Sequence, residues 1–173
     1  QIVFSPVKAE GWYTLEVDGK KSRPFRIGRD AYIPAAWKTL NFFFSERCGF
    51  DVPGIHTECH MDVMSVHPDG RRLPVCGGWH DAGDLTQAAI NTAESVFAML
   101  ELAIAEREAQ PELSQRAKEE ARWGLNWLMR TRWGDGYRHN GTVIGFWSDN
   151  IQGTLDDINA DSGNRPFDNF MIA

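Results

Sequence analysis

The sequence predicts a mainly α-helical protein that begins with a short β segment. Trp12 to Val17 is an aromatic and β-branched run with rough alternation, which is typical of a strand. Farther along the chain, apolar residues recur at helical spacing in three long stretches. With 173 residues, the chain is long enough for one ordinary domain with a real core.

The β segment is expected to occupy residues 1–28. Asp18-Gly19 is a strong turn signal, and a second run from Ser22 to Ile27 follows it. Pro24 places that second run at a sheet edge or at the end of a strand. Because two or three strands do not make a stable domain alone, we expect these residues to be the tail of a β-sandwich.

Three helices are expected at about residues 30–47, 85–109 and 113–132, and a fourth begins at Pro166. Gly49 is suited to ending the first helix in the left-handed conformation. Residues 49–83 form a predicted long loop, and loops of this length are usually functional or held by a ligand. The positions expected to be buried are Leu85, Ala89, Val96, Met99, Leu100 and Ala103 on the second helix and Ala117, Ala121, Leu125 and Leu128 on the third.

The composition excludes two classes of partner. The net charge is −6 and no basic stripe is present, which argues against a nucleic-acid partner. No apolar run approaches the length of a membrane span. The first residues have neither the basic start nor the apolar core of a signal peptide, as in a mature or trimmed chain.

The stretch from Gly77 to Asp84, Gly-Gly-Trp-His-Asp-Ala-Gly-Asp, carries the strongest chemical signal. Asp81 and Asp84 lie three residues apart before a predicted helix, whose N-terminus favours them as carboxylates. Two ionised carboxylates can hold a water and remove its proton. An alternative is that Asp84 only caps the helix, with Gln87 completing a capping box. Capping and catalysis are compatible, so both readings stay open.

The same eight residues resemble the signature of family-9 glycoside hydrolases, the inverting cellulases and related β-glucanases. The common form of that signature is Gly-Gly-Trp-(Tyr or His)-Asp-Ala-Gly-Asp. The resemblance implies that Asp84 is the catalytic base and that Asp81 helps to hold the attacking water. Weaker similarities concern Ser22–Ile27 with the end of an immunoglobulin-like module, Tyr32–Cys48 with the first helix of the family, Trp123–Met129 with a barrel helix, and Pro166–Phe170 with a helix start.

The resemblance implies a partial (α/α)₆ barrel, preceded by the last strands of an immunoglobulin-like β-sandwich. We therefore expect residues 1–28 to end the sandwich and residues 29–173 to begin the catalytic domain. The family barrel has twelve helices and carries its general acid, a Glu, near its far end. No Glu here matches that acid, since Glu94, Glu101, Glu106 and Glu108 are expected on a solvated helix face. The remainder of the same polypeptide is expected to supply it.

The implied activity is inverting hydrolysis of β-1,4-glucosidic bonds in cellulose or related β-glucans. Trp79, Trp133 and Trp147 are candidates for sugar subsites, with core packing as the alternative for each. We expect a secreted, periplasmic or cell-surface enzyme. A competing interpretation is a non-catalytic carbohydrate-binding or assembly fragment. A third is another (α/α) enzyme such as a lyase, which would call for a Tyr or His base.

Two cysteines and two histidines, Cys48, Cys59, His60 and His80, make a set suitable for a closed tetrahedral zinc site. Buried free thiols and loop histidines are the alternative. Family members with the preceding sandwich bind a structural zinc through two Cys and two His, one of them directly before the first motif Asp. The resemblance therefore implies a structural zinc with His80 in that place.

Other metal candidates are weaker. Cys76 is left over and is expected to be a buried thiol, while His56 and His67 are reserve ligands expected to be exposed to solvent. Calcium is common in the family, and Asp156, Asp157 and Asp161 offer oxygen ligands. A solvated acidic loop is the favoured interpretation of these three, so no calcium ligand is assigned.

Overall fold

The computed structural model describes residues 7–61, 63–81, 87–143 and 165–166. This part of the chain divides into two compact units, one up to Thr39 and one from Leu40 onward, which are described separately. The described helices and strands are, in chain order, β1 (Gly11–Tyr13), β2 (Glu16–Val17), β3 (Lys20–Lys21), β4 (Phe25–Ile27), α1 (Ile33–Ser45), β5 (Met64–Val66), β6 (Arg72–Pro74), β7 (Gln87–Ala88), α2 (Ala89–Ala105), α3 (Pro111–Arg130), β8 (Gly141–Val143) and β9 (Arg165–Pro166).

The first unit contains two antiparallel strand pairs. β1 pairs with β4 and β2 pairs with β3. Asp18 and Gly19 have φ angles of 50° and 75°, the positive values that a two-residue hairpin turn with matching twist requires. The predicted turn is therefore confirmed, whereas the immunoglobulin-like origin of residues 1–28 stays a prediction.

Helix α1 crosses the division between the units and ends close to its predicted boundary. Gly49, four residues beyond Ser45, has a φ of 70°, which agrees with the left-handed position predicted for it. Leu40 on this helix is 2% exposed. The end of α1 therefore belongs to the packed interior of the second unit.

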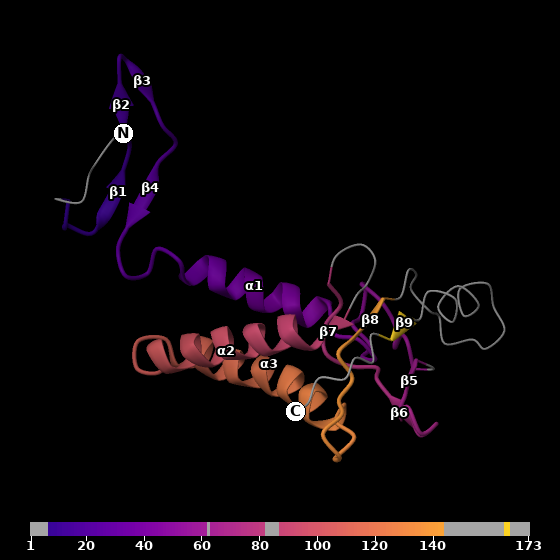
Figure 1. Cartoon of the computed structure of the whole chain (residues 1–173). Coiled ribbons are helices and arrows are strands. Elements are labelled where there is room, and N and C mark those ends of the chain that lie inside the picture. The colour runs from indigo at the N-terminus through magenta and orange to yellow at the C-terminus, as the bar shows by residue number, and fades with distance from the viewer. Residues whose placement is uncertain (1–6, 62, 82–86, 144–164, 167–173) are drawn as a thin grey trace. The chain divides into compact units, whose positions relative to one another are not determined.

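Helices α2 and α3 lie side by side and form the main helical pair of the second unit (Figure 1). Pro111 occupies the first turn of α3, where its missing N–H is not needed. The Ser114 hydroxyl donates a hydrogen bond of 2.7 Å to the carbonyl of Ala103 and so joins the two helices. The predicted helices are present, and the rest of an (α/α)₆ barrel stays a prediction.

The start of α2 was predicted four residues too early. Gln87 and Ala88 belong to β7, which pairs with β8, and the backbone N–H of Ala89 bonds the carbonyl of Asn140. This pairing joins residues about fifty positions apart, and local helical signals do not report it. Ala88 is the N-cap of α2 and makes no side-chain cap bond.

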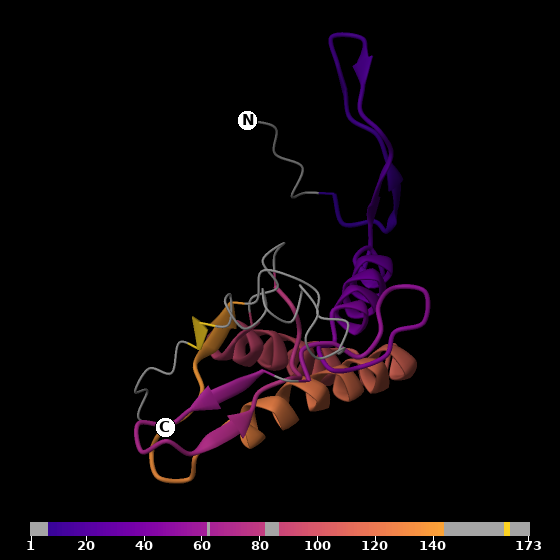
Figure 2. The ribbon, with the colours of Figure 1, turned by 90° about the vertical axis from the view of Figure 1, so that its right-hand side faces the viewer.

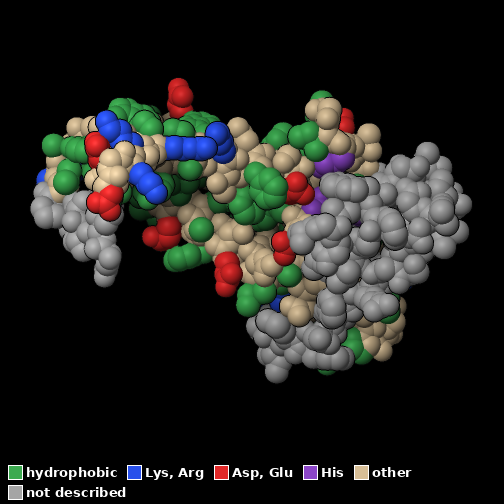
Figure 3. Space-filling view, turned by 90° about the horizontal axis from the view of Figure 1, so that it is seen from above, with side chains coloured by type: hydrophobic (Ala, Val, Ile, Leu, Met, Phe, Trp, Pro, Cys, Tyr) green, Lys and Arg blue, Asp and Glu red, His purple; other side chains and the backbone are tan. Residues whose placement is uncertain are grey.

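Leu85 lies outside the described residues. The other predicted buried positions on α2 and α3 are buried, with two exceptions. Leu100 is 40% exposed and Leu125 is 44% exposed. Hydrophobic side chains accordingly lie at the surface among acidic and other side chains (Figure 3). Conversely, Glu120 on α3 is fully buried, which the helical pattern did not predict.

The predicted long loop of residues 49–83 contains a hairpin. Strands β5 and β6 pair antiparallel with Ser65 opposite Leu73 (Figure 2). A second small sheet has the order β7-β8-β9. Pro166 belongs to β9 and does not start the predicted fourth helix, whose remaining residues 167–173 lie outside the described part. No helix in the described ranges combines the length and apolar character that a membrane crossing needs.

Gly124 gives α3 a gap into which the Trp79 ring fits. A Cβ at this position would overlap the Trp79 ring and approach Val96 Cγ2 to 2.8 Å. Trp79 is 6% exposed. The packing of this ring therefore requires glycine at position 124.

We expect Gly124→Ala to destabilise the protein even though Ala is the better helix former. The helix gain is about 1 kcal/mol, whereas forcing a methyl into a packed interior costs about 1–3 kcal/mol. A clash with ring atoms lies at the upper end of that cost. Denaturant unfolding should show a net loss, while Arg122→Ala, an exposed change on the same helix, should stay within about 0.5 kcal/mol. An unchanged or raised stability of Gly124→Ala would contradict the packing described.

Candidate metal centre and acidic motif

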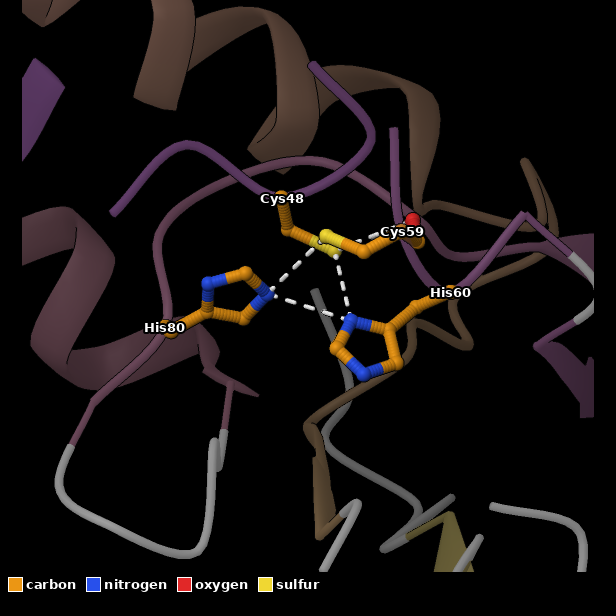
Figure 4. Close-up of side chains that lie close together, drawn as sticks. All are labelled: Cys48, Cys59, His60 and His80. Atoms are coloured by element: carbon orange, nitrogen blue, oxygen red, sulfur yellow. Dashed lines mark hydrogen bonds between the residues drawn. The ribbon is translucent and has the colours of Figure 1, made fainter. Parts of the chain in front are cut away.

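The structure brings together the four predicted metal ligands. Their donor atoms, the sulfurs of Cys48 and Cys59 and one ring nitrogen each of His60 and His80, all lie within 4.8 Å of one another (Figure 4). Cys48 Sγ is 3.5 Å from His60 Nδ1, and Cys59 Sγ is 3.5 Å from His80 Nε2. The two ring nitrogens are 3.1 Å apart.

The three individual separations fit a tetrahedral ion. Zinc bonds of about 2.3 Å to sulfur and about 2.0–2.1 Å to nitrogen place neighbouring sulfur and nitrogen ligands about 3.6 Å apart, and two nitrogens about 3.3 Å apart. The observed sulfur–nitrogen and nitrogen–nitrogen distances of 3.5 Å and 3.1 Å are close to these values. Two thiols and two imidazoles are also the donor chemistry that zinc prefers.

The four ligands come from separate places in the chain, and each is buried. Cys48 follows the end of α1, Cys59 and His60 lie before β5, and His80 lies in the acidic motif, residues 77–84. Two adjacent residues can direct their donors to one point only if the backbone bends between them. His60 has a φ of 57°, an uncommon value for a residue with a side chain, and this turns its ring toward the cluster.

The electrostatics of the two thiols differ. Burial raises the pKa of the Cys48 thiol. Hydrogen bonding to Cys48, with smaller effects from His60 and His80, lowers the pKa of the Cys59 thiol to about 2. The cluster therefore already favours one thiolate, the form in which cysteine binds a metal.

The surroundings of the cluster fix its geometry. The backbone N–H of His80 donates to the carbonyl of Glu46 at 2.8 Å, and the Glu46 carboxylate lies 4.0 Å from His80 Nδ1. The backbone N–H of Gly49 points at Cys59 Sγ at 3.5 Å. Contacts of this kind orient metal ligands in proteins.

The other cysteine and histidine candidates of the sequence are not part of the four-residue cluster. Cys76 is buried beside Cys48 and Cys59, as expected for a leftover thiol, and burial raises its pKa. His56 bonds backbone carbonyls of Ser45 and Thr57. His67 is only 8% exposed, so its predicted exposure is wrong; it packs under Tyr137 at a ring distance of 4.8 Å.

The acidic motif presents one carboxylate to solvent in the described part of the chain. Asp81 is exposed, directly after two buried residues, and Asn91 Nδ2 donates to its Oδ2 at 3.0 Å. Asp84 lies outside the described residues. Gln87 is buried and donates from Nε2 to the carbonyl of Gly77 at 2.9 Å. It lies in β7, before the N-cap residue Ala88, so it is not at the N3 position of α2 that the capping box requires.

The three candidate sugar-binding tryptophans have different positions. Trp79 is buried between Phe43, at a ring distance of 5.0 Å, and α3, so its ring is placed to hold the motif. Trp133 is half-buried and lies 5.2 Å from the His67 ring. Trp147 and the acidic residues weighed for calcium, from position 156 to 161, lie outside the described part.

Three residues that contact the motif or its partners were not predicted from the sequence. They are Arg47, Asn91 and Glu120. Asn91 contacts Asp81, and Glu120 accepts bonds from Arg47 and from the indole of Trp79. The only local signal was the spacing of Glu120 and Trp123 on one side of a helix, which does not identify partners far away in sequence.

Sequence relatives agree with these observations. The family model described as glycosyl hydrolase family 9 matches residues 32–162. A cellodextrinase of Butyrivibrio fibrisolvens is 35% identical over 104 residues, 56% of this chain and 19% of that protein. Endoglucanase C of Cellulomonas fimi is 30% identical over 166 residues, 73% of this chain and 15% of that protein. The chain thus spans less than a fifth of the length of these relatives.

Solved structures extend the likeness to the fold. A thermostable endoglucanase of Alicyclobacillus acidocaldarius superposes with a TM-score of 0.62 at 25% identity, over 94% of this chain and 33% of that chain. A Zn-binding triple mutant of the family-9 endoglucanase J30 gives a TM-score of 0.60 at 26% identity, over 94% of this chain and 34% of that one. With the family match covering most of its residues and the motif in place, the chain belongs to glycosyl hydrolase family 9.

Proposed function

We propose that this chain carries the nucleophile-activating half of an inverting hydrolase of β-1,4-glucosidic bonds in cellulose or related β-glucans. The observation that carries the proposal is the exposed carboxylate of Asp81, held by Asn91 beside a rigid buried cluster. The names of the relatives support a β-glucan substrate, since they include endoglucanases and a cellodextrinase. The partners are thus a β-glucan chain and the remainder of the polypeptide.

Asp84 acts as the general base in this proposal. It takes a proton from a water, Asp81 orients the same water by accepting a hydrogen bond, and the water attacks the anomeric carbon. A Glu outside this chain protonates the leaving oxygen. In inverting enzymes the two carboxyl groups stand roughly 6.5–9.5 Å apart, which leaves room for the water.

We further propose that Cys48, Cys59, His60 and His80 hold a structural zinc. An ion with four protein ligands has no open position, so it supplies rigidity and takes no part in the chemistry. His80 directly precedes Asp81, and a ligand bond at His80 therefore limits the movement of the Asp81 backbone. No calcium ligand is assigned.

A non-catalytic carbohydrate-binding role is the second candidate. The hydrogen-bonded, exposed Asp81 favours the enzyme over this candidate. The two candidates differ in one measurable property, which is turnover of a β-glucan by the protein that contains this chain.

We expect Asp84→Asn to remove nearly all hydrolysis of a soluble β-glucan while the thermal stability is kept. An amide can cap a helix as well as a carboxylate can, but it cannot accept the proton of water. Asp81→Asn should also lower turnover by about 10²-fold or more, the range for general base catalysis. Turnover and thermal unfolding are to be measured on the same samples. A fully active Asp84→Asn would refute the assignment of the base.

We expect one zinc per chain, which should be lost in Cys59→Ser together with a lower melting temperature. A hydroxyl replaces the thiolate that zinc prefers, and a structural zinc stabilises the folded state. Metal analysis after chelation and dialysis measures the content. Cys76→Ser is the matched control, because it removes a neighbouring buried thiol that is not among the four ligands. Equal zinc loss in both variants, or no zinc in the unaltered protein, would contradict the site.

A further inference from the structure

One face of α3 lies along the segment Val75–Trp79, which leads into and begins the acidic motif. The residues of this face are spaced by three, four and three positions, which places them on one side of a helix. Each makes a polar contact with the segment Val75–Trp79. The contacts are Glu120 Oε1 with Trp79 Nε1 (2.8 Å), Trp123 Nε1 with the Gly78 carbonyl (2.7 Å), Trp127 Nε1 with the Val75 carbonyl (2.8 Å) and Arg130 Nη2 with the Cys76 carbonyl.

The two glycines of the motif permit this close approach. Gly77 and Gly78 have φ angles of 114° and 66°, which residues with side chains rarely adopt. A Cβ at either position would lie 3.0 Å from a ring atom of Trp127. The backbone of the motif therefore lies directly against the tryptophan face of α3.

The motif is also paired with the segment that follows α1. The N–H of Cys48 bonds the carbonyl of Gly78 at 3.1 Å, and the N–H of His80 bonds the carbonyl of Glu46 at 2.8 Å. Arg47 lies between them, opposite Trp79. The motif is thus held both by backbone bonds to the segment after α1 and by α3, and the Gly78 carbonyl accepts a bond from each.

Glu120 on α3 contacts both the segment after α1 and the motif. Its side chain is 0% exposed and accepts bonds from Arg47 Nε at 3.0 Å, Arg47 Nη2 at 2.9 Å and Arg116 Nη1 at 2.7 Å. The Trp79 indole shares the Oε1 that Arg47 Nε uses. A carboxylate with four charged or polar donors has a defined orientation, and each donor it holds loses freedom with it.

Arg47 is constrained further by aromatic rings. Its guanidinium lies 4.6 Å from the Trp123 ring centroid and 4.8 Å from that of Phe44. Because Arg47 directly precedes Cys48, this arrangement links the buried carboxylate to the metal cluster. Glu120 is therefore connected to Asp81 along two paths. One runs through Trp79, and the other runs through Arg47 and the neighbouring ligand Cys48.

We propose that Glu120 is a positioning residue for the reaction: it orients Trp79 and Arg47, and thereby sets the position of the Asp81 carboxylate. This inference rests on the proposed function. A residue that only stabilised the fold through ion pairs would not affect turnover selectively. The positioning role predicts a larger effect on turnover than on substrate binding.

The test uses Glu120→Gln and Trp79→Phe in the protein that contains this chain. Glu120→Gln keeps the size but leaves two guanidiniums without a carboxylate and turns an amide N–H₂ toward donors. Trp79→Phe removes the N–H, but it also removes indole atoms that lie nearest Gly124. The matched control is Glu119→Gln, the neighbouring Glu on α3, which is exposed and bonds only Gln115 among the contacts that the described structure shows.

We expect kcat of Glu120→Gln to fall about 10- to 100-fold, as for a small misplacement of a reacting group, with KM within about threefold and the zinc content unchanged. Trp79→Phe should lower kcat in the same direction. The double variant should be no slower than Glu120→Gln alone, because both changes break the same contact. Glu119→Gln should match the unaltered protein in all readouts.

Hydrogen exchange supplies a readout that does not depend on activity. Amides of residues 77–81 should exchange faster in Glu120→Gln and Trp79→Phe than in Glu119→Gln. A kcat of Glu120→Gln within twofold of normal, additive losses in the double variant, or unchanged exchange in the motif would overturn the inference. If Glu120→Gln does not fold, Trp79→Phe decides by comparison with Gly124→Ala, which disturbs the same ring packing but keeps the N–H: kcat and exchange in residues 77–81 no more altered than in Gly124→Ala would overturn the inference.

The failure of the inference is distinguishable from failure of the proposed function. If the unaltered protein hydrolyses β-glucan and Asp84→Asn does not, a normal Glu120→Gln overturns the positioning role alone. If the unaltered protein shows no hydrolysis, the proposed function fails, and the positioning role, which rests on it, falls with it.

Discussion

The buried carboxylate of Glu120 is the constraint on which the second unit depends most. A charge without solvent is costly unless it is paired, and here the partners come from α3, from the end of α1 and from the acidic motif. Removing any one partner leaves a buried group with an unmet hydrogen-bonding need. The three segments are therefore held to one arrangement by electrostatics in addition to apolar packing.

Three consecutive residues of the motif have three different environments. Trp79 is anchored to Glu120 and the Gly124 gap, His80 to the metal cluster, and Asp81 is exposed with Asn91 as its partner. Two fixed neighbours in succession leave the Asp81 backbone little freedom. Preorganisation of this kind is what positions a catalytic group without the cost of ordering it during the reaction.

Local pattern predicted what depends on neighbours in sequence. The helical spacing located α1, α2 and α3, and Asp18-Gly19 located a hairpin turn. The four candidate metal ligands were named from residue types and family resemblance, and the structure brings their donors together.

The burial of Glu120 could not be predicted, because its partners Arg47 and Trp79 lie 73 and 41 residues away. A Glu among Arg, Lys and Ala on a helix is typical of a solvated face. The start of α2 was misplaced for the same reason, since β7 exists only through its pairing with β8.

The order of residues in the motif follows from these demands. Gly77 and Gly78 adopt φ angles and contacts with Trp127 that a side chain would prevent. The next residue meets the gap at Gly124 and an acceptor at Glu120, which a large ring with one N–H donor satisfies. The residue after that faces two thiols and an imidazole, where a second imidazole completes a tetrahedral donor set. Asp81 is then the first residue of the motif that is exposed to solvent. Its exposure follows from the packing of the four residues before it, and the same packing restricts the backbone that carries the carboxylate.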